Sequence, residues 1–490
     1  MFPASENTKS RECTLEVVRK IEALGTASTR EYPPVDKGMR AYQYLVAMFT
    51  IETIVWGFAN SFGVLLNFYQ HDPRSPINPT PNSKLILTLV GTINTGTIGG
   101  AGELKLALVR ETPLVSFWIA KNPGIRVRVR LFGLLACALS LFLSAYSDSA
   151  IHILWSQGIG YGIGGCALYY SALSHLPEWF DKKRGFATGV IFTGTGIGGL
   201  GFPLILDSLL GKYGARLALQ IVTVLFTIPI VLAVCFIRPR SLPDNPHHDS
   251  LGQSVMTSEK EALPISVNLI RNFYRCLTGA FWIYIFLNTL QSTVFYLPGL
   301  YLPSNENDEH LSIAYVDCLG RGNVTGSALL SIVNAGTIFA QLAAGFLSDH
   351  YSPFLIGAIA NILGGTSVLI IWGALSHLSI AWLFVFSAFY GSTAGAWTSL
   401  YFQVLKPFIS DQELLFSAFG ILSMTRGLGN ILGGPISAAL VTSTSTDPYQ
   451  CSGFPKGPFS GLIWFTGLAF ISCGLIGNAL WIHFRRKNQE

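Results

Sequence analysis

Long apolar stretches recur twelve times along this chain, and they constrain its fold more than any other feature. Each approaches the ~17 to 25 apolar residues that a helix needs to cross the hydrocarbon core of a membrane. Stretches of this length suit helices, because a membrane-spanning strand needs only about 9 to 11 residues. The sequence therefore predicts an all-α membrane protein with twelve transmembrane helices. The expected spans are residues 42–69, 85–102, 131–147, 151–176, 186–206, 217–237, 276–300, 326–347, 354–375, 379–405, 414–441 and 460–483.

The composition and the placement of charge support this prediction. Only 12% of the 490 residues are charged, whereas soluble globular domains contain about 25%. With the N-terminus inside, 25 of the 32 Lys and Arg residues fall in cytoplasmic segments, 6 fall in outside loops, and Arg426 falls in a span. The positive-inside rule then predicts cytoplasmic N- and C-termini, and we expect the plasma membrane. The net charge of +5 is explained by this asymmetry, so we expect no nucleic acid partner.

The two halves of the chain resemble each other at nearly constant spacing. Chance alignment of two apolar stretches is the alternative explanation. If the similarity is a true repeat, it predicts two six-helix halves with the substrate site near the middle of the membrane between them. At an offset of 232, Leu168-Tyr169-Tyr170 matches Leu400-Tyr401-Phe402, and Gly201 and Pro203 match Gly433 and Pro435; at an offset of 240, Asn94, Gly96 and Thr97 match Asn334, Gly336 and Thr337.

A polar segment from Pro239 to Asn272 separates the halves and has the composition of a linker. The N-terminal residues are polar and mixed in charge, which predicts a disordered tail. The expected domains are a cytoplasmic tail (1–40), a first six-helix half (41–240), a cytoplasmic linker (241–271), a second half (272–484) and a short cytoplasmic tail (485–490).

The first half is longer than the second, because the two offsets differ by 8 residues between Ile98 and Pro203. The charged segment 99–112, GGAGELKLALVRET, is the candidate insertion. It is either a genuine charged loop or an interruption of a span that continues into PLVSFWIA. An unspliced intron in the gene would give the same pattern.

Two charges lie inside expected spans and are the leading site candidates. Glu52 lies about ten residues into the first span and Arg426 about twelve into the eleventh. Both therefore lie ~15 to 18 Å from the cytoplasmic side at about 1.5 Å per residue. A charge at this depth costs at least ~2.5 to 3.5 kcal/mol and normally faces a protein interior or a watery cavity. In one interpretation, Arg426 binds an anionic solute while Glu52 takes up a proton. The alternatives are a static ion pair or two charges that reach the interface separately.

Other polar residues have weaker signals. The sequon Asn323-Val324-Thr325 predicts glycosylation at Asn323 in an outside loop, and Cys318 and Cys451 are both expected outside, where a disulfide is an open option. The candidates for lining a cavity are Asn60, Asn94, Tyr169, Gln291, Asn334, Trp397 and Gln403.

Motifs for enzyme chemistry are missing from the non-membrane segments. The two clusters GIGYGIGG (158–165) and GTGIGGLG (194–201) contain G-x-G-x-x-G, but they lie within expected spans without a preceding strand. Close packing of helices through small residues explains them better. We therefore expect no enzyme, no cofactor and no metal, and the lack of a P-loop argues against transport powered by the chain's own ATP hydrolysis.

The chain resembles the major facilitator superfamily, and within it the fungal branch similar to monocarboxylate porters. The resemblance covers residues 42–484 and rests on ETIVWGFANSFGVLLNFY from Glu52, WFDKKRGFATG from Trp179, GTGIGGLGFP from Gly194, FWIYIFLNTLQSTVFYLPGLYLPS from Phe281 and TRGLGNILGGPIS from Thr425.

This chain departs from the superfamily signature Gly-x-x-x-Asp-Arg. The first half lacks it, and the second half keeps a remnant, GFLSDH from Gly345, with His350 in place of Arg. The resemblance implies secondary active transport of a small organic solute by alternating access, with a monocarboxylate as the first candidate and proton coupling. An exporter of a secondary metabolite is the alternative within transport. A membrane sensor or scaffold that does not transport is the alternative from another class, and a monomer is the default expectation.

Overall fold

The computed structural model describes residues 33–77, 80–107, 123–240, 279–301, 323–409, 412–441, 457 and 459–487, and no strand occurs in this part of the chain. The first half forms α2 (Met39–Asn60), α3 (Phe62–His71), α4 (Pro81–Ala107), α6 (Pro123–Ser144), α7 (Ala150–Ile153), η1 (Leu154–Gly160), α8 (Tyr161–Leu173), α9 (Leu176–Trp179) and α10 (Arg184–Phe236). The second half forms α13 (Gly279–Phe295), α14 (Leu297–Tyr301), α16 (Asn323–Ser348), α17 (Pro353–Ser367), η3 (Val368–Leu375), α18 (Ile380–Ala394), η4 (Thr398–Leu400), α19 (Tyr401–Leu405), α20 (Gln412–Leu440) and α21 (Ser460–Lys487).

Every expected span falls on helix. Within the described residues, 9 helices are long and apolar enough to cross a membrane. One of them, α10, contains two expected spans, and α4 and the α7–η1–α8 run account for the remaining two. The all-α membrane fold is therefore confirmed.

The two expected spans within α10 are separated by a break at Gly214. An unbroken helix of 53 residues would be ~80 Å long, far more than the ~30 Å thickness of the hydrocarbon core. Gly214 has φ 73° and ψ 174°, a conformation that glycine adopts without the clash that a Cβ would cause. This residue ends one membrane crossing and allows the next to begin.

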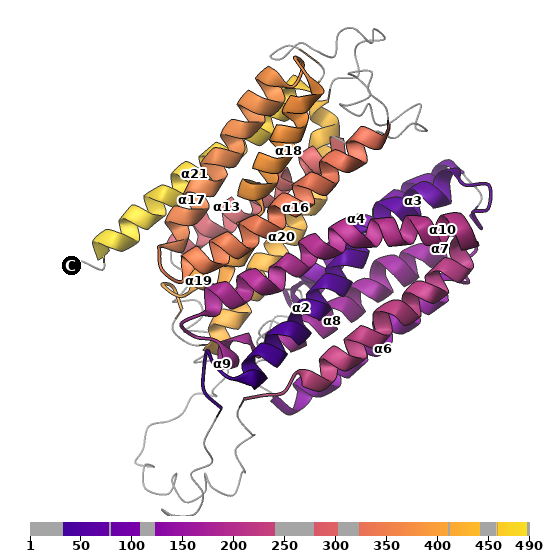
Figure 1. Cartoon of the computed structure of the whole chain (residues 1–490), viewed down its shortest axis with the longest axis horizontal. Helices are drawn as coiled ribbons and strands as arrows, with labels where there is room; N and C mark the ends of the chain where they lie inside the picture. The colour runs from indigo at the N-terminus through magenta and orange to yellow at the C-terminus, as the bar shows by residue number, and fades with distance from the viewer. Residues whose placement is uncertain are drawn as a thin grey trace, which may run out of the picture.

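The helices form two groups (Figure 1). The indigo to magenta helices α2–α10 lie together, and the orange to yellow helices α13–α21 lie beside them. The most extensive contacts between the groups, within the described residues, are those of α10 along α16 and of α4 along α20. Within the first group α10 also packs along α2, so α10 contacts both groups.

The α2–α10 contact depends on glycine. A Cβ on Gly198 would lie 2.4 Å from the Thr53 carbonyl oxygen and 2.7 Å from the Gly57 Cα. Only glycine at this position lets the two backbones come so close. The second glycine cluster thus serves helix packing, as its sequence predicts.

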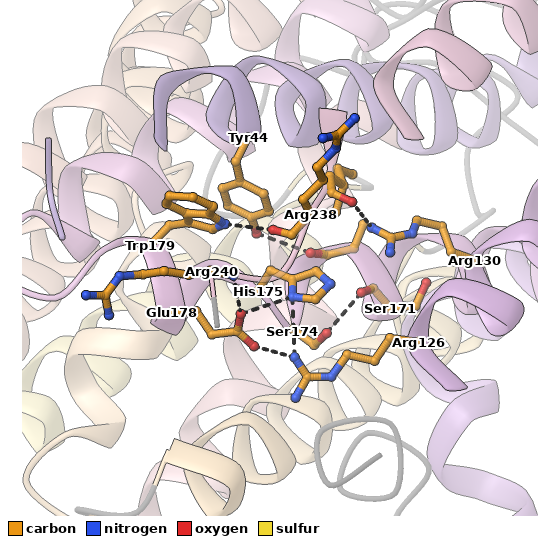
Figure 2. A network of polar contacts seen from close by, with 12 residues as sticks. Tyr44, Arg126, Arg130, Ser171, Ser174, His175, Glu178, Trp179, Arg238 and Arg240 are labelled. Atoms are coloured by element: carbon orange, nitrogen blue, oxygen red, sulfur yellow. Dashed lines mark hydrogen bonds and ion pairs between the residues drawn. The ribbon is translucent and has the colours of Figure 1, made fainter. Parts of the chain in front are cut away.

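A polar network closes one end of the first group, which we call the α9 end (Figure 2). Glu178 of α9 accepts a hydrogen bond from Arg126 of α6, and its other oxygen accepts one from the Arg240 backbone N–H at 3.2 Å. His175 contacts the same carboxylate at 3.3 Å. The Trp179 indole N–H donates to the carbonyl of Arg238 at 3.1 Å. The network thereby fastens the start of α6 and the segment after α10 to the short helix α9.

The prediction that residues 33–40 belong to a disordered tail is wrong. Helix α2 already begins at Met39, and the Asp36 carboxylate accepts the backbone N–H groups of Asp181, Lys182 and Lys183 at 2.9, 3.0 and 3.0 Å. Burial by itself would raise the pKa of Asp36, but these three donors lower it below its ordinary value. This contact is specific to one carboxylate and leaves no trace in hydropathy. Residues 1–32 and the expected linker lie outside the described residues.

The expected boundary of the second span is also wrong. Helix α4 continues to Ala107, so the first part of the candidate insertion is helical and does not form a loop. The remaining residues of that insertion, 108–112, lie outside the described part of the chain.

Candidate functional site

A cavity lies between the two groups, and both contribute to its lining. The first group supplies residues of α2, α4, α8 and α10, and the second supplies residues around α13, α16, η4, α19 and α20. Within the described residues, the lining contains no Leu, Ile, Val, Met or Ala. Its apolar surface is aromatic and comes from Trp56, Tyr169, Phe192, Phe295, Tyr296, Tyr401 and Phe419.

Glu52 faces the cavity from α2. Its residue surface is 1% exposed, and one carboxyl oxygen accepts a hydrogen bond from the Thr195 hydroxyl at 2.6 Å. The Tyr169 hydroxyl lies beside the same carboxyl group. The other oxygen, Oε2, has no hydrogen-bond partner among the residues that the structure describes. Because an ionised carboxylate is costly in such a buried place, this group is suited to bind a proton or a donor from a solute.

Arg426 faces the same cavity from α20. Its guanidinium donates to the Gln291 side-chain oxygen at 3.2 Å and lies over the Phe295 ring at 5.0 Å from the ring centre. The hydroxyls of Tyr296 and Tyr401 lie next to it. All of these neighbours are neutral, so the cation keeps its full charge toward the cavity.

Glu52 and Arg426 line one cavity without forming an ion pair with each other, since no bridge between them occurs among the described residues. The structure therefore does not contain the static ion pair that the sequence left open as an alternative. The carboxyl group instead lies on α2 of the first group, and the guanidinium lies on α20 of the second group. A solute that enters the cavity can contact both.

Four buried polar atoms in the lining have no hydrogen-bond partner within the described part of the chain. They are Glu52 Oε2, Trp56 Nε1, Gln341 Oε1 and Asn430 Oδ1. Buried polar groups are usually hydrogen-bonded, and exceptions call for an explanation. Their shared location in one cavity indicates a place where a polar ligand binds.

The cavity includes some of the polar residues expected from the sequence and leaves others elsewhere. Asn60, Tyr169 and Asn334 line it together with the two charges. Gln291 lies behind Arg426 and supports it. Asn94 is fully buried outside the lining, and neither side-chain polar atom of this residue has a hydrogen-bond partner in the described segments.

The expected lining role is wrong for Trp397 and Gln403. The Trp397 indole stacks on Tyr284 with ring centres 5.4 Å apart and donates to Asn288 at 2.9 Å. Gln403 donates to Asp349 at 2.6 Å. Both residues sit on segments with helical turns, where a shift of one or two positions turns a side chain away from the cavity.

Asp349 connects the two groups at the α9 end. Its carboxylate accepts the backbone N–H groups of Gly185 and Phe186 at 2.7 and 2.8 Å. These are among the first residues of α10, and a carboxylate is favourable at a helix N-terminus. The remnant of the signature motif therefore fixes α16 to α10.

Two further expectations, the glycosylation and the disulfide, cannot be followed in the structure. Asn323 is the first residue of α16, but its side chain lies outside the described part, so glycosylation there stays a prediction. Cys318 and Cys451 lie outside the described residues. Among the described residues no group of His, Cys, Asp and Glu could hold a metal ion.

Known proteins similar to this chain are membrane transporters. The family model described as Major Facilitator Superfamily matches residues 112–409. MFS transporter asaE of Aspergillus flavus is 24% identical over 462 residues, which cover 94% of this chain and 92% of the relative. Agnestins efflux protein AgnL12 of Paecilomyces divaricatus is 23% identical over 453 residues, covering 92% and 91%. Monocarboxylate transporter 13 of Bos taurus is 26% identical over 341 residues, covering 67% and 71%.

Proposed function

Because this chain belongs to the Major Facilitator Superfamily and is a solute transporter rather than an enzyme, we propose that it transports an organic anion. A monocarboxylate or a related organic acid is the first candidate, and the chain moves it by alternating access with proton coupling. The observation that carries the proposal is that Arg426 and Glu52 face one cavity from different groups of helices and do not pair with each other. Arg426 holds the carboxylate of the solute, and Glu52 exchanges the proton.

The test uses purified protein in lipid vesicles with an imposed pH gradient. Uptake of candidate acids is measured for the wild type, Glu52→Gln and Arg426→Ala, with Arg74→Ala as a control because Arg74 lies at the surface in a loop pair with Asp72. We expect Arg426→Ala to reduce uptake at least about tenfold, as loss of a charged hydrogen-bonding group does. We expect Glu52→Gln to remove the dependence on the gradient. Uptake that stays complete and coupled to pH in both variants would refute the proposal.

Export of a secondary metabolite is the second candidate. It is supported by a relative whose name describes efflux of agnestins and by another named as a fujikurins efflux protein. The two candidate functions differ in the direction in which the solute is transported. Comparison of metabolites inside and outside cells with and without the protein separates them, since an exporter lacking function leaves its solute inside the cell.

We also propose that the chain lies in the plasma membrane with both termini and the α9 end on the cytoplasmic side, as a monomer built of two six-helix halves. The excess of Lys and Arg in the segments at that end supports this orientation. Protease treatment of intact cells is expected to spare tags at both termini. Cleavage of either tag would contradict the orientation.

A further inference from the structure

We infer that the solute is an aromatic carboxylate that carries additional oxygen groups, such as a hydroxylated benzoate. The inference rests on the proposed transport of organic anions and names the class of anion. Three features of the cavity support it: the kind of apolar surface, the single cation, and the polar atoms that have no partner.

Among the described residues, every large apolar side chain that lines the cavity is aromatic. A pocket for a short aliphatic acid would be expected to include Leu, Ile, Val or Ala, and none lines this cavity within the described residues. Rings pack in edge-to-face or offset arrangements, and Trp56 and Tyr169 already form an edge-to-face pair with centres 6.2 Å apart. A flat solute fits between such walls better than a puckered ring of the same size.

The position of the carboxylate follows from Arg426. It is the only Lys or Arg in the lining among the described residues, and its neighbours Gln291 and Phe295 are neutral. A guanidinium binds a carboxylate through two parallel hydrogen bonds. With the carboxylate there, the ring of the solute extends from Arg426 toward the aromatic side chains contributed by the first group.

The additional oxygen groups follow from the polar atoms without partners. Within the described residues, Trp56 Nε1 is a donor without an acceptor, and the Gln341 and Asn430 side chains each leave their oxygen unpaired. Gln341 is 6% exposed, so it is nearly shielded from bulk solvent. A phenolic hydroxyl both donates and accepts. It can satisfy either the indole N–H or an amide, and a solute with only a carboxylate and a ring leaves these groups unmatched.

The first experiment measures the uptake of a labelled hydroxybenzoate into vesicles containing the wild-type protein. It compares how strongly matched unlabelled compounds compete with that uptake. The probes are the three monohydroxybenzoates, benzoate, cyclohexanecarboxylate and methyl 4-hydroxybenzoate. We expect at least one hydroxybenzoate to bind about tenfold more tightly than benzoate, because a site built to hydrogen-bond discriminates against a solute lacking the group. We expect benzoate to bind more tightly than cyclohexanecarboxylate, and the uncharged ester to compete poorly.

The second experiment separates the ring of Trp56 from its N–H group. Trp56→Phe keeps an aromatic wall and removes the donor, whereas Trp56→Leu removes both. Trp282→Phe is the matched control, because Trp282 is 56% exposed on α13 and lies outside the cavity. We expect Trp56→Phe to reduce the preference for the hydroxybenzoate over benzoate about fivefold. We expect Trp56→Leu to weaken the binding of both compounds, and Trp282→Phe to change the binding of neither.

The outcomes distinguish this inference from the proposed function. Equal competition by hydroxybenzoates, benzoate and cyclohexanecarboxylate, unchanged in both Trp56 variants, would overturn the aromatic class while leaving transport of organic anions intact. Competition by the ester at least as strong as that by the acids would overturn both. The expected ranking, lost only in the Trp56 variants, supports both.

Discussion

At the scale of single residues, Asn288 links the cavity to its surroundings. This α13 amide is fully buried, and it donates to the Leu422 carbonyl at 2.7 Å and to the Thr425 hydroxyl at 2.9 Å. Its oxygen accepts from the Trp397 indole and from the Tyr401 hydroxyl at 2.9 and 2.6 Å. Since Tyr401 lies next to Arg426 and lines the cavity, Asn288 fixes the position of a lining residue without being part of the lining itself.

The first prediction concerns Asn288→Ala. The substitution leaves the Trp397 N–H and the Tyr401 O–H buried without an acceptor, at about 1 to 3 kcal/mol each. We expect a lower midpoint temperature of unfolding in detergent and weaker binding of the transported anion. Asn361→Ala is the control, because the Asn361 side chain is also buried but donates to the Gly357 carbonyl of its own helix. Equal effects of the two substitutions on binding would contradict the positioning role.

The sequence predicts the two charged residues of the cavity, but it predicts only some of the other residues that line it. Depth along a helix can be counted from the chain, so Glu52 and Arg426 could be assigned to one level of the membrane. Which side of a helix faces the cavity depends on packing with distant helices, and for this reason Trp397 and Gln403 were misplaced. Tyr401 was missed although it matches Tyr169 at the offset of 232, and both line the cavity. Applying the repeat to Tyr169 would have identified it.

At the scale of elements, the twelve spans were predictable because hydropathy is a local property. The contacts that hold the ends of these helices could not be predicted from hydropathy. Helix α9 has only 4 residues and no hydropathy signal, yet Glu178 on it connects α6 with the segment after α10 (Figure 2). Asp349 similarly joins α16 to the start of α10. These single carboxylates determine how the helix ends meet.

The second prediction concerns the pH dependence of this connection. Burial alone would raise the pKa of Glu178, but His175 and the Arg126 guanidinium outweigh it and lower the pKa to about 2 from an ordinary 4.5. The ionised form is therefore favoured in the folded protein, and its stabilisation is complete above pH 4.5 and is lost as the pH falls toward 2. A shift of this size corresponds to at most ~3 kcal/mol.

We expect Glu178→Gln to unfold at a lower temperature than the wild type at pH 7, with the difference shrinking as the pH is lowered from about 5 to 3. Thermal unfolding of both proteins in detergent across this pH range measures the difference in unfolding temperature. Asp207→Asn is the control, because Asp207 is exposed on α10 and takes part in none of the ion pairs found among the described residues. A difference between wild type and Glu178→Gln that does not depend on pH would contradict the assigned charge effect.

At the scale of the whole molecule, the two groups of helices meet along two seams, α10 with α16 and α4 with α20. Access to the cavity from alternate sides requires the groups to move relative to each other. Contacts across a seam must therefore change during transport, whereas contacts within a group can persist. A Cβ on Gly96 of α4 would lie 2.9 Å from the end of the Ile431 side chain on α20, so this pair reports on one seam.

The third prediction is that a covalent link between positions 96 and 431 stops transport. In a variant whose native cysteines are replaced, Gly96→Cys with Ile431→Cys is treated with a short bifunctional thiol reagent cleavable by reductant. We expect at least about tenfold slower uptake, recovered after reduction, because the α4–α20 seam can no longer separate.

Gly467→Cys with Leu369→Cys provides the matched control. It also joins a glycine to a long side chain, with a Cβ on Gly467 lying 2.5 Å from Leu369, but both positions belong to the second group. A link there leaves the groups free to move, so uptake should stay within about twofold of the untreated variant. Normal uptake with the 96–431 link complete would show that this seam stays closed throughout transport. Relative motion would then have to occur without separation of α4 from α20, which is incompatible with rocking of two rigid halves about the cavity.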